Sequence, residues 1–212
     1  PVDDDGTAPI SIGFRFTFGA TVYTDVRIIS NGRLQFGNNY CGYGTQAVGP
    51  PPTYPYNYPN GNMNNTMRVY GADFCPAGGG AGCSGRVTYA LLGSAPNRQF
   101  VVTWSQMKEW NSGTSLFNVQ MILQETGDFV YQYKDVANVS QGAGQIGYQL
   151  SAADYVVVDA TTINSIAYSS LRFFKPTPPL AEYRLDECSG VTAADVSGNG
   201  YNGTLAGGVS LA

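Results

Sequence analysis

Residues 10–18 read Ile-Ser-Ile-Gly-Phe-Arg-Phe-Thr-Phe, with an apolar side chain at every second position. A period of two is typical of a β-strand that buries one face. Further along, two alternating runs flank Asn31-Gly32, a dipeptide typical of type I′ hairpin turns because both central residues of that turn need positive φ. The first part of the chain therefore predicts antiparallel hairpins.

The same alternation recurs as far as residue 175, and helical periodicity is almost absent. Further predicted strands lie at residues 87–91, 100–104, 117–123, 129–133, 146–150, 155–158 and 171–174. Eight to ten short antiparallel strands over residues 8–175 predict an all-β fold, an antiparallel two-layer β-sandwich. Trp104 is in phase with Phe100 and Val102, so we expect it in the core.

Two segments interrupt this pattern. Residues 37–66 form a long loop rich in Tyr, Pro and Asn, and a loop of this length is typically functional or mobile. Residues 176–180 form a stiff Pro-rich linker between a β-sandwich domain at 1–175 and a β-rich extension at 181–212. An extension of this size cannot bury a core alone, so we interpret it as the truncated start of a second domain. Because the chain opens on Pro1, we interpret it as a processed or trimmed piece of a longer protein.

The composition excludes several classes of function. The chain has no histidine, which removes His-based triads, His-ligated zinc and imidazole proton shuttles. The formal net charge is −4 and only 12% of residues are charged, so there is no basic stripe for nucleic acid or for acidic lipid surfaces. No apolar run approaches the length of a membrane span, so direct membrane insertion is not expected.

The four cysteines suggest an oxidising compartment. Cys75 and Cys83 enclose a Gly-rich segment whose spacing suits a disulfide loop better than a metal knuckle. Cys41 and Cys188 remain, either paired with each other across the linker or, for Cys188, paired with a cysteine outside this sequence. With few lysines and many Tyr and Asn residues, this pattern predicts an extracellular or cell-surface protein.

Exposed aromatic residues are the predicted ligand-binding groups. Tyrosine faces are large and rigid, and neighbouring asparagines supply adaptable hydrogen bonds, so such a surface suits sugar rings or a protein partner. The alternative is that these tyrosines cover a sheet edge while the prolines prevent strand addition. The predicted residues are Tyr40, Tyr43, Tyr54, Tyr56 and Tyr58 of the long loop, together with Trp110.

Acidic residues offer weaker hypotheses. Asp3, Asp4 and Asp5 could supply oxygen ligands to calcium, but a solvated terminus explains them better. Asp195 opens the first half of a calcium-loop pattern whose closing glutamate is missing, so a turn is the better interpretation and no metal is expected.

Paired carboxylates are the one acid–base mechanism that remains open, as in glycoside hydrolysis. A tight turn already explains Glu125 and Asp128, because acidic residues favour such positions. Within the main domain the candidate acids are Asp73, Glu109, Glu125 and Asp128.

Several stretches resemble known extracellular families. Residues 16–37, from Phe16-Thr-Phe-Gly to Leu-Gln-Phe-Gly37, resemble the opening of bacterial nidogen-like domains, and residues 98–104 and 120–133 resemble their later strands. Residues 181–187 and 195–203 are similar to the start of laminin-G-like, concanavalin A-like jelly rolls. This order, with Tyr-Pro-Tyr-Asn-Tyr-Pro-Asn-Gly-Asn-Met-Asn at 54–64 between them, resembles MSHA-type pilus biogenesis proteins, the MshQ group of Gram-negative bacteria. The resemblance implies a surface or pilus-associated adhesive protein and supplies no catalytic residues.

The leading hypothesis is therefore a non-enzymatic extracellular module of a bacterial surface or pilus-associated adhesin that binds a surface glycan or a protein. The alternative is a structural subunit of a surface filament, assembled with other copies of itself or with pilus subunits through its C-terminal strands. A third hypothesis is a carboxylate-dependent glycan hydrolase that uses residues such as Glu109 and Glu125.

Overall fold

The computed structural model describes residues 5–40, 57–58, 61–139, 146–158, 166–174, 180–186, 189–204 and 206. Within these ranges the chain forms strands and turns and contains no helix. The chain divides into two compact units, Pro1–Phe174 and Lys175–Ala212.

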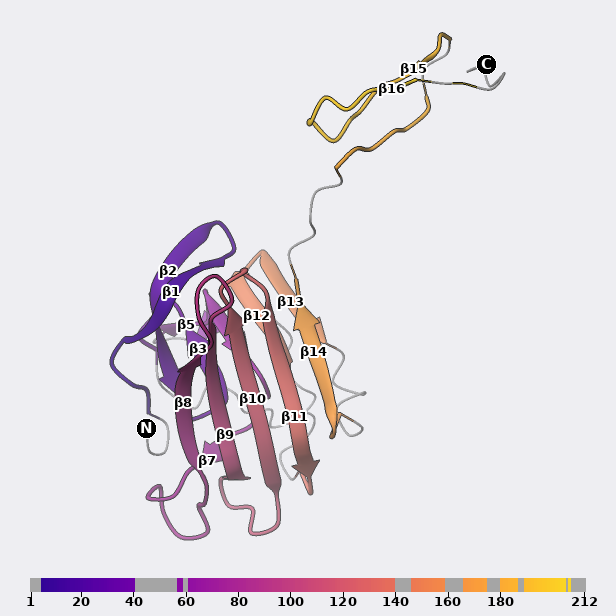
Figure 1. Cartoon of the computed structure of the whole chain (residues 1–212). Helices are drawn as coiled ribbons and strands as arrows, with labels where there is room; N and C mark the ends of the chain where they lie inside the picture. The colour runs from indigo at the N-terminus through magenta and orange to yellow at the C-terminus, as the bar shows by residue number, and fades with distance from the viewer. Residues whose placement is uncertain are drawn as a thin grey trace. The chain divides into compact units, whose positions relative to one another are not determined.

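The first unit contains two large antiparallel sheets (Figure 1). The first sheet has the order β1-β2-β3-β6-β12-β13. Its strands are β1 (Ile10–Phe18), β2 (Thr21–Ile29), β3 (Arg33–Gln35), β6 (Thr66–Arg68), β12 (Ile146–Ser151) and β13 (Asp154–Val158).

The second sheet has the order β14-β11-β10-β9-β7, and β8 also pairs with β9. Its strands are β7 (Phe74–Cys75), β8 (Arg86–Leu92), β9 (Gln99–Glu109), β10 (Leu116–Gln124), β11 (Phe129–Ala137) and β14 (Ser169–Phe173). A separate hairpin joins β4 (Asn57–Tyr58) and β5 (Gly61–Asn62).

The two sheets pack face to face around one aromatic core. The ring of Phe18 on β1 lies 5.7 Å from Tyr148 on β12 and 6.2 Å from Phe129 on β11. Trp104 on β9 is completely buried, and its indole N–H donates to the backbone oxygen of Ile29 at 3.1 Å, which links the sheets. The predicted antiparallel β-sandwich is therefore confirmed, and so is the core position of Trp104.

The predicted hairpin at Asn31-Gly32 is confirmed, but its predicted turn type is wrong. Ile29 pairs with Arg33, so three residues connect β2 to β3 instead of two. Among Ser30, Asn31 and Gly32 only the glycine has a positive φ, +69°. A Cβ on Gly32 would also lie 2.9 Å from the backbone oxygen of Tyr70, so this position requires glycine.

The side chain of Arg98 connects the turn between β10 and β11 in the second sheet to β1 in the first sheet. The Arg98 guanidinium donates to both carboxylate oxygens of Glu125 and to the backbone oxygen of Gly13. This pairing lowers the pKa of Glu125 to about 2, with the hydrogen bond from the Arg98 side chain as the main cause.

A carboxyl whose pKa is depressed in the folded state stabilises that state above its unfolded pKa and loses this effect as the pH falls. The loss should extend from the ordinary pKa of 4.5 down to about 2. As the pH falls through this window, the melting temperature of Glu125→Gln should therefore decrease less than that of the parent chain. Circular dichroism measures both melting temperatures. The control is Asp25→Asn, which removes an exposed carboxylate of β2. Its melting temperature should decrease with pH as that of the parent does. Parallel acid profiles for Glu125→Gln and the parent would contradict the assignment.

The second unit is described by itself. It contains one small hairpin, β15 (Thr192–Ala193) with β16 (Gly203–Thr204), and an isolated bridge between Tyr183 and Asp195. Within its described residues Ala193 is the one buried hydrophobic side chain.

Candidate functional site

The outer face of the second sheet carries a continuous row of uncharged polar side chains, which we call the neutral row. Directly paired residues share one face of a sheet, and each member is paired with the next across five strands. The half-buried members are Thr103 and Gln120, and the remaining three are exposed. In order, the row contains Thr88, Thr103, Gln120, Gln132 and Ser170.

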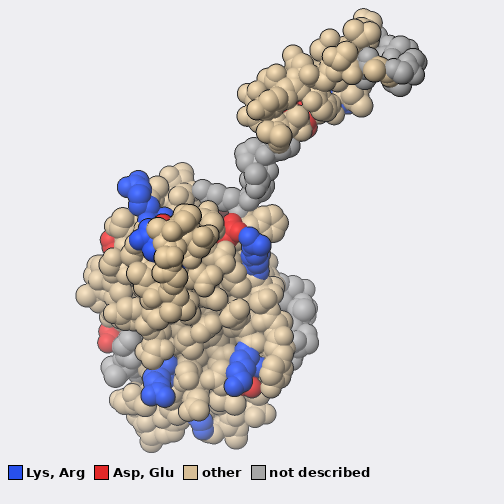
Figure 2. All heavy atoms as spheres, in the orientation of Figure 1, with Lys and Arg blue, Asp and Glu red and all other residues tan. Residues whose placement is uncertain are grey.

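A groove of about 250 Å³ lies along one side of the neutral row. Its lining consists of Thr103, Ser105, Asn118, Val119, Gln120, Gln132 and Lys134. This lining contains one cation and no carboxylate. Figure 2 views the molecule from this side, where uncharged residues cover most of the surface.

On the other side of the neutral row lies an apolar row. Its members are Ala90, Val101, Ile122 and Val130, each paired with the next on strands β8 to β11. Val101 is buried, Ile122 and Val130 are half-buried and Ala90 is exposed. Hydrogen-bonding groups and an apolar surface therefore lie side by side on this face.

The groove is partly pre-organised by hydrogen bonds among its own side chains. Gln120 Nε2 donates to Thr103 Oγ1 at 2.7 Å. Asn118 Nδ2 donates to Asp135 Oδ2 at 2.8 Å, and Asn118 Oδ1 accepts from the backbone N–H of Gln106 at 2.8 Å.

Three polar side chains of this lining are available to bind a ligand. Within the described part of the chain, the side chains of Ser105, Gln132 and Lys134 form no hydrogen bond or ion pair. Together they offer a hydroxyl, an amide and an ammonium group to a molecule in the groove.

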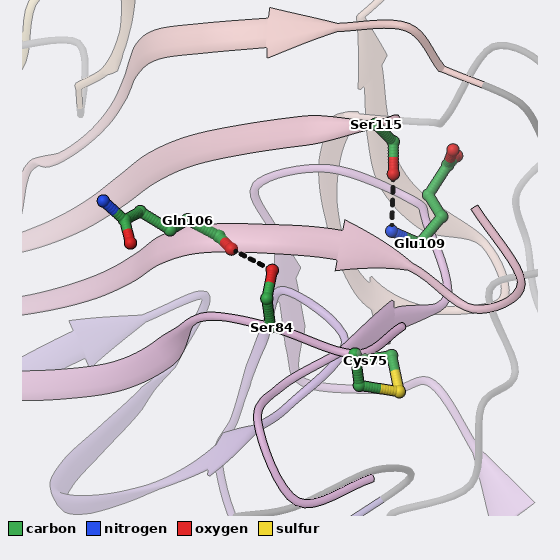
Figure 3. Close-up of a disulfide and its surroundings, with 6 residues drawn as sticks. Cys75, Ser84, Gln106, Glu109 and Ser115 are labelled. Atoms are coloured by element: carbon green, nitrogen blue, oxygen red, sulfur yellow. Dashed lines mark hydrogen bonds between the residues drawn. A yellow bond between two sulfur atoms is a disulfide. The ribbon is translucent and has the colours of Figure 1, made fainter. Parts of the chain in front are cut away.

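The predicted Cys75–Cys83 disulfide is formed (Figure 3). The segment after it is tied to β9, where the Ser84 hydroxyl donates to the backbone oxygen of Gln106 at 2.9 Å. Cys41 and Cys188 lie outside the described residues, so their pairing stays a prediction.

Trp110 lies beside this disulfide loop. The residue is 37% exposed at the end of β9, and its ring is 3.6 Å from where a Cβ on Gly80 would be. It does not line the groove and remains a second aromatic surface.

The predicted aromatic loop is described only at its margin. Tyr40 is partly buried, with its ring centre 5.4 Å from the guanidinium carbon of Arg33. Tyr43, Tyr54 and Tyr56 lie outside the described residues, as does the side chain of Tyr58, although its backbone forms part of β4.

The four candidate acids of the main domain do not form an exposed pair in the groove. Asp73 and Glu109 are buried, with 5% and 1% of their surface exposed. Figure 3 shows Glu109 beside Ser115, whose Oγ accepts the Glu109 backbone N–H at 2.8 Å. Glu125 is paired with Arg98, and Asp128 with Arg172. This arrangement matters because general acid–base hydrolysis needs two carboxyl groups that face one substrate, and these four candidates do not face the groove together.

The suggested calcium ligands have other roles where they are described. Oδ1 of Asp195 accepts the backbone N–H groups of Glu182 and Ser197, and Oδ2 accepts that of Tyr201. Hydrogen bonds from the Ser197 side chain and from these backbone groups lower the pKa of Asp195. Asp5 accepts from the N–H of Gly6, while Asp3 and Asp4 lie outside the described residues. No group of three or more metal-binding acids or cysteines occurs in the described ranges.

A family model described as NIDO related matches residues 1–175. The chain belongs to the NIDO-related family. No curated protein and no solved structure matches it. The predicted nidogen-like character of the first domain is confirmed, while the MshQ and laminin-G-like assignments remain predictions. The NIDO-related domain and its disulfide indicate an extracellular protein, because disulfides persist in oxidising environments. No helix capable of crossing a membrane occurs in the described residues.

The sequence did not identify the groove of the NIDO-related domain. Outward-facing positions of each strand follow from the period of two, but the neutral row exists only once the strands are aligned in register. One usable signal was present: outward positions of three predicted strands carry Thr103, Gln120 and Gln132 where charged residues are more usual on a sheet surface.

Proposed function

We propose that this chain is a non-enzymatic extracellular binding module of a bacterial surface or pilus-associated adhesin. The groove beside the neutral row is the contact site for its partner, a surface glycan or a protein. The observation that carries this proposal is the row of uncharged hydrogen-bonding side chains that spans five strands of the second sheet, with an open groove beside it. The resemblance of the whole chain to MshQ-type proteins supports the adhesive role.

Two observations favour binding over catalysis. The sequence has no histidine, so proton transfer would depend mainly on carboxyl groups. The four acids considered as candidates for catalysis are either buried, as Asp73 and Glu109 are, or ion-paired, as Glu125 and Asp128 are.

The test compares attachment of the parent chain and a groove variant. Fluorescent beads coated with the parent should adhere to some members of a panel of immobilised bacterial polysaccharides and extracellular-matrix glycoproteins. Beads coated with the folded double variant Ser105→Ala/Gln132→Ala should adhere several-fold less, because it loses a hydroxyl and an amide of the lining. Equal attachment by both would contradict the groove as the contact site, and deletion of residues 50–62 would then test the aromatic loop. Attachment of neither to any surface would contradict the binding role.

A second candidate function is a structural subunit of a surface filament. Large apolar side chains in the second unit are exposed to solvent, including Leu180 at 74%, Val191 at 62% and Leu185 at 56%. Such exposure favours burial against another polypeptide, for example a neighbouring copy. Light scattering should then detect concentration-dependent assembly, whereas a strict monomer at high concentration would contradict it.

A further inference from the structure

We infer that the ligand of the groove is an uncharged polysaccharide chain, which lies across the strands along the neutral row. This inference rests on the proposed function and names the chemical class of its partner. It follows from three properties of the face: which groups are available, how far they extend and what charge they carry.

The groups available on this face are side chains. Strands β9, β10 and β11 are each paired on both sides, so their backbone N–H and C=O groups are used within the sheet. A peptide that adds to a sheet as a strand needs a free edge, which these central strands do not offer. Recognition here therefore depends on side-chain hydroxyls and amides.

Those side chains match sugar hydroxyl groups. A hydroxyl and a carboxamide each donate and accept hydrogen bonds, as a sugar hydroxyl does, so Thr103, Gln120 and Gln132 can bond a saccharide without a charge on either side. The apolar row, with Ile122 and Val130 half-buried, lies one row away on the same face. Rows on one face are two residues apart, about 6.7 Å, so a sugar ring can hydrogen-bond through its edge while its C–H face packs on the aliphatic side chains.

The neutral row is long. It crosses five strands, and four inter-strand spacings of about 4.8 Å give a length of about 19 Å. This is several times the width of one sugar ring. A chain of sugars can contact the whole row, whereas a monosaccharide contacts a small part of it.

The charges around the neutral row do not favour an acidic ligand. Lys134 is the one charged residue in the groove lining. The carboxylate of Asp135 follows it in the chain and is held near the groove by Asn118. These two neighbouring charges oppose each other, and Arg172, opposite Val130, is ion-paired with Asp128. Arg86, opposite Ser105 on β8, adds one more cation at the edge of this face, while the chain as a whole is acidic. Lys134 therefore serves as a hydrogen-bond donor to a hydroxyl oxygen more than as an anion site.

The experiment is native electrophoresis of the complete chain through gels that contain a single polysaccharide. Neutral gels contain a β-glucan, a xylan or a galactomannan, and acidic gels contain alginate or polygalacturonate. The parent should be retarded in at least one neutral gel. Its apparent affinity should be unchanged between about 0.05 and about 0.5 M NaCl, because no ion pair is screened.

The variant Thr103→Val/Gln132→Leu removes two hydrogen-bonding groups while keeping side-chain size. We expect its affinity to fall about tenfold or more. The control is Gln124→Leu on β10, outside the neutral row and the groove lining, which should bind within about twofold of the parent. Thermal unfolding of both variants establishes that they are folded.

Three outcomes would overturn the inference. They are retardation by acidic polysaccharides alone with loss at high salt, equal affinity of the Thr103→Val/Gln132→Leu variant and the parent, and retardation by no polysaccharide. In the last case the bead assay separates the two proposals. Attachment to glycoprotein surfaces that depends on Ser105 and Gln132 and survives removal of their glycans would leave the proposed function standing with a protein partner.

Discussion

Replacing Trp104 by alanine should lower the free energy of unfolding by about 3–5 kcal/mol, the cost typical of a large aromatic residue removed from a core. Trp104 is 0% exposed and its indole N–H satisfies the backbone oxygen of Ile29. The variant therefore leaves a cavity between the sheets and a buried carbonyl that has lost this donor. Urea denaturation followed by far-ultraviolet circular dichroism measures the loss.

The chain supplies its own control for this substitution, since its other tryptophan, Trp110, is at the surface. Trp110→Ala should cost much less, about 1 kcal/mol or below, because the side chain is 37% exposed. Trp104→Phe keeps most of the volume and should give an intermediate loss. Equal losses for Trp104→Ala and Trp110→Ala would contradict the position of Trp104 in the core.

Replacing Gly147 by alanine should destabilise the first sheet by about 3 kcal/mol or more, through both close contact and backbone strain. A Cβ at this position would lie 1.9 Å from the backbone oxygen of Val156 on the neighbouring strand, and φ of Gly147 is +151°. The same residue joins the sheets, because its backbone oxygen accepts the Tyr131 hydroxyl at 2.9 Å. Separation of β13 from β12 should therefore accompany the loss.

Two measurements test this expectation. Urea denaturation gives the global loss, and hydrogen exchange should show faster exchange of the β13 amides that pair with β12. Gly113→Ala is the matched control, since a Cβ there meets nothing within 4 Å and the backbone lies outside the left-handed region. We expect Gly113→Ala to be neutral or slightly stabilising. The prediction for Gly147 would be wrong if both alanine variants unfolded at the same urea concentration.

The longer strands could be predicted from the sequence because each buries one face. The alternation at residues 10–18 corresponds to β1, and the alternating runs around Phe117 and Phe129 correspond to β10 and β11. In these strands every second side chain is apolar and points into the sandwich, while most outward ones are polar, with Ile122 and Val130 of the apolar row as exceptions, so the pattern in the sequence largely follows the pattern of burial.

The centre of the first sheet could not be predicted in this way. Residues 37–66 read as an uninterrupted loop, yet Thr66 begins β6, which lies between β3 and β12. In β6 every residue is buried, including Arg68, and in β3 so are Arg33 and Gln35. A three-residue strand with polar residues buried on one face shows no apolar period, because tertiary contacts determine its burial.

The groove was missed for a different reason. The identity of Thr103, Gln120 and Gln132 as outward residues follows from their strands, but their alignment depends on register. Register also changes within these strands, where a bulge beside Asn118 shifts the pairing of β10 with both β9 and β11. A local pattern carries no information about the partner residue on another strand, so the sequence favoured exposed tyrosines instead.

The scarcity of charge beside the neutral row has a kinetic consequence. Oppositely charged surfaces steer each other together, and without such steering association proceeds at an ordinary rate, about 10⁵–10⁶ M⁻¹ s⁻¹. A long polysaccharide presents the same segment many times, and a surface that displays many copies of this domain can engage several segments at once. Such a surface binds through avidity, so its adhesion should rise steeply with the density of displayed domains. The adhesion should also persist at high ionic strength.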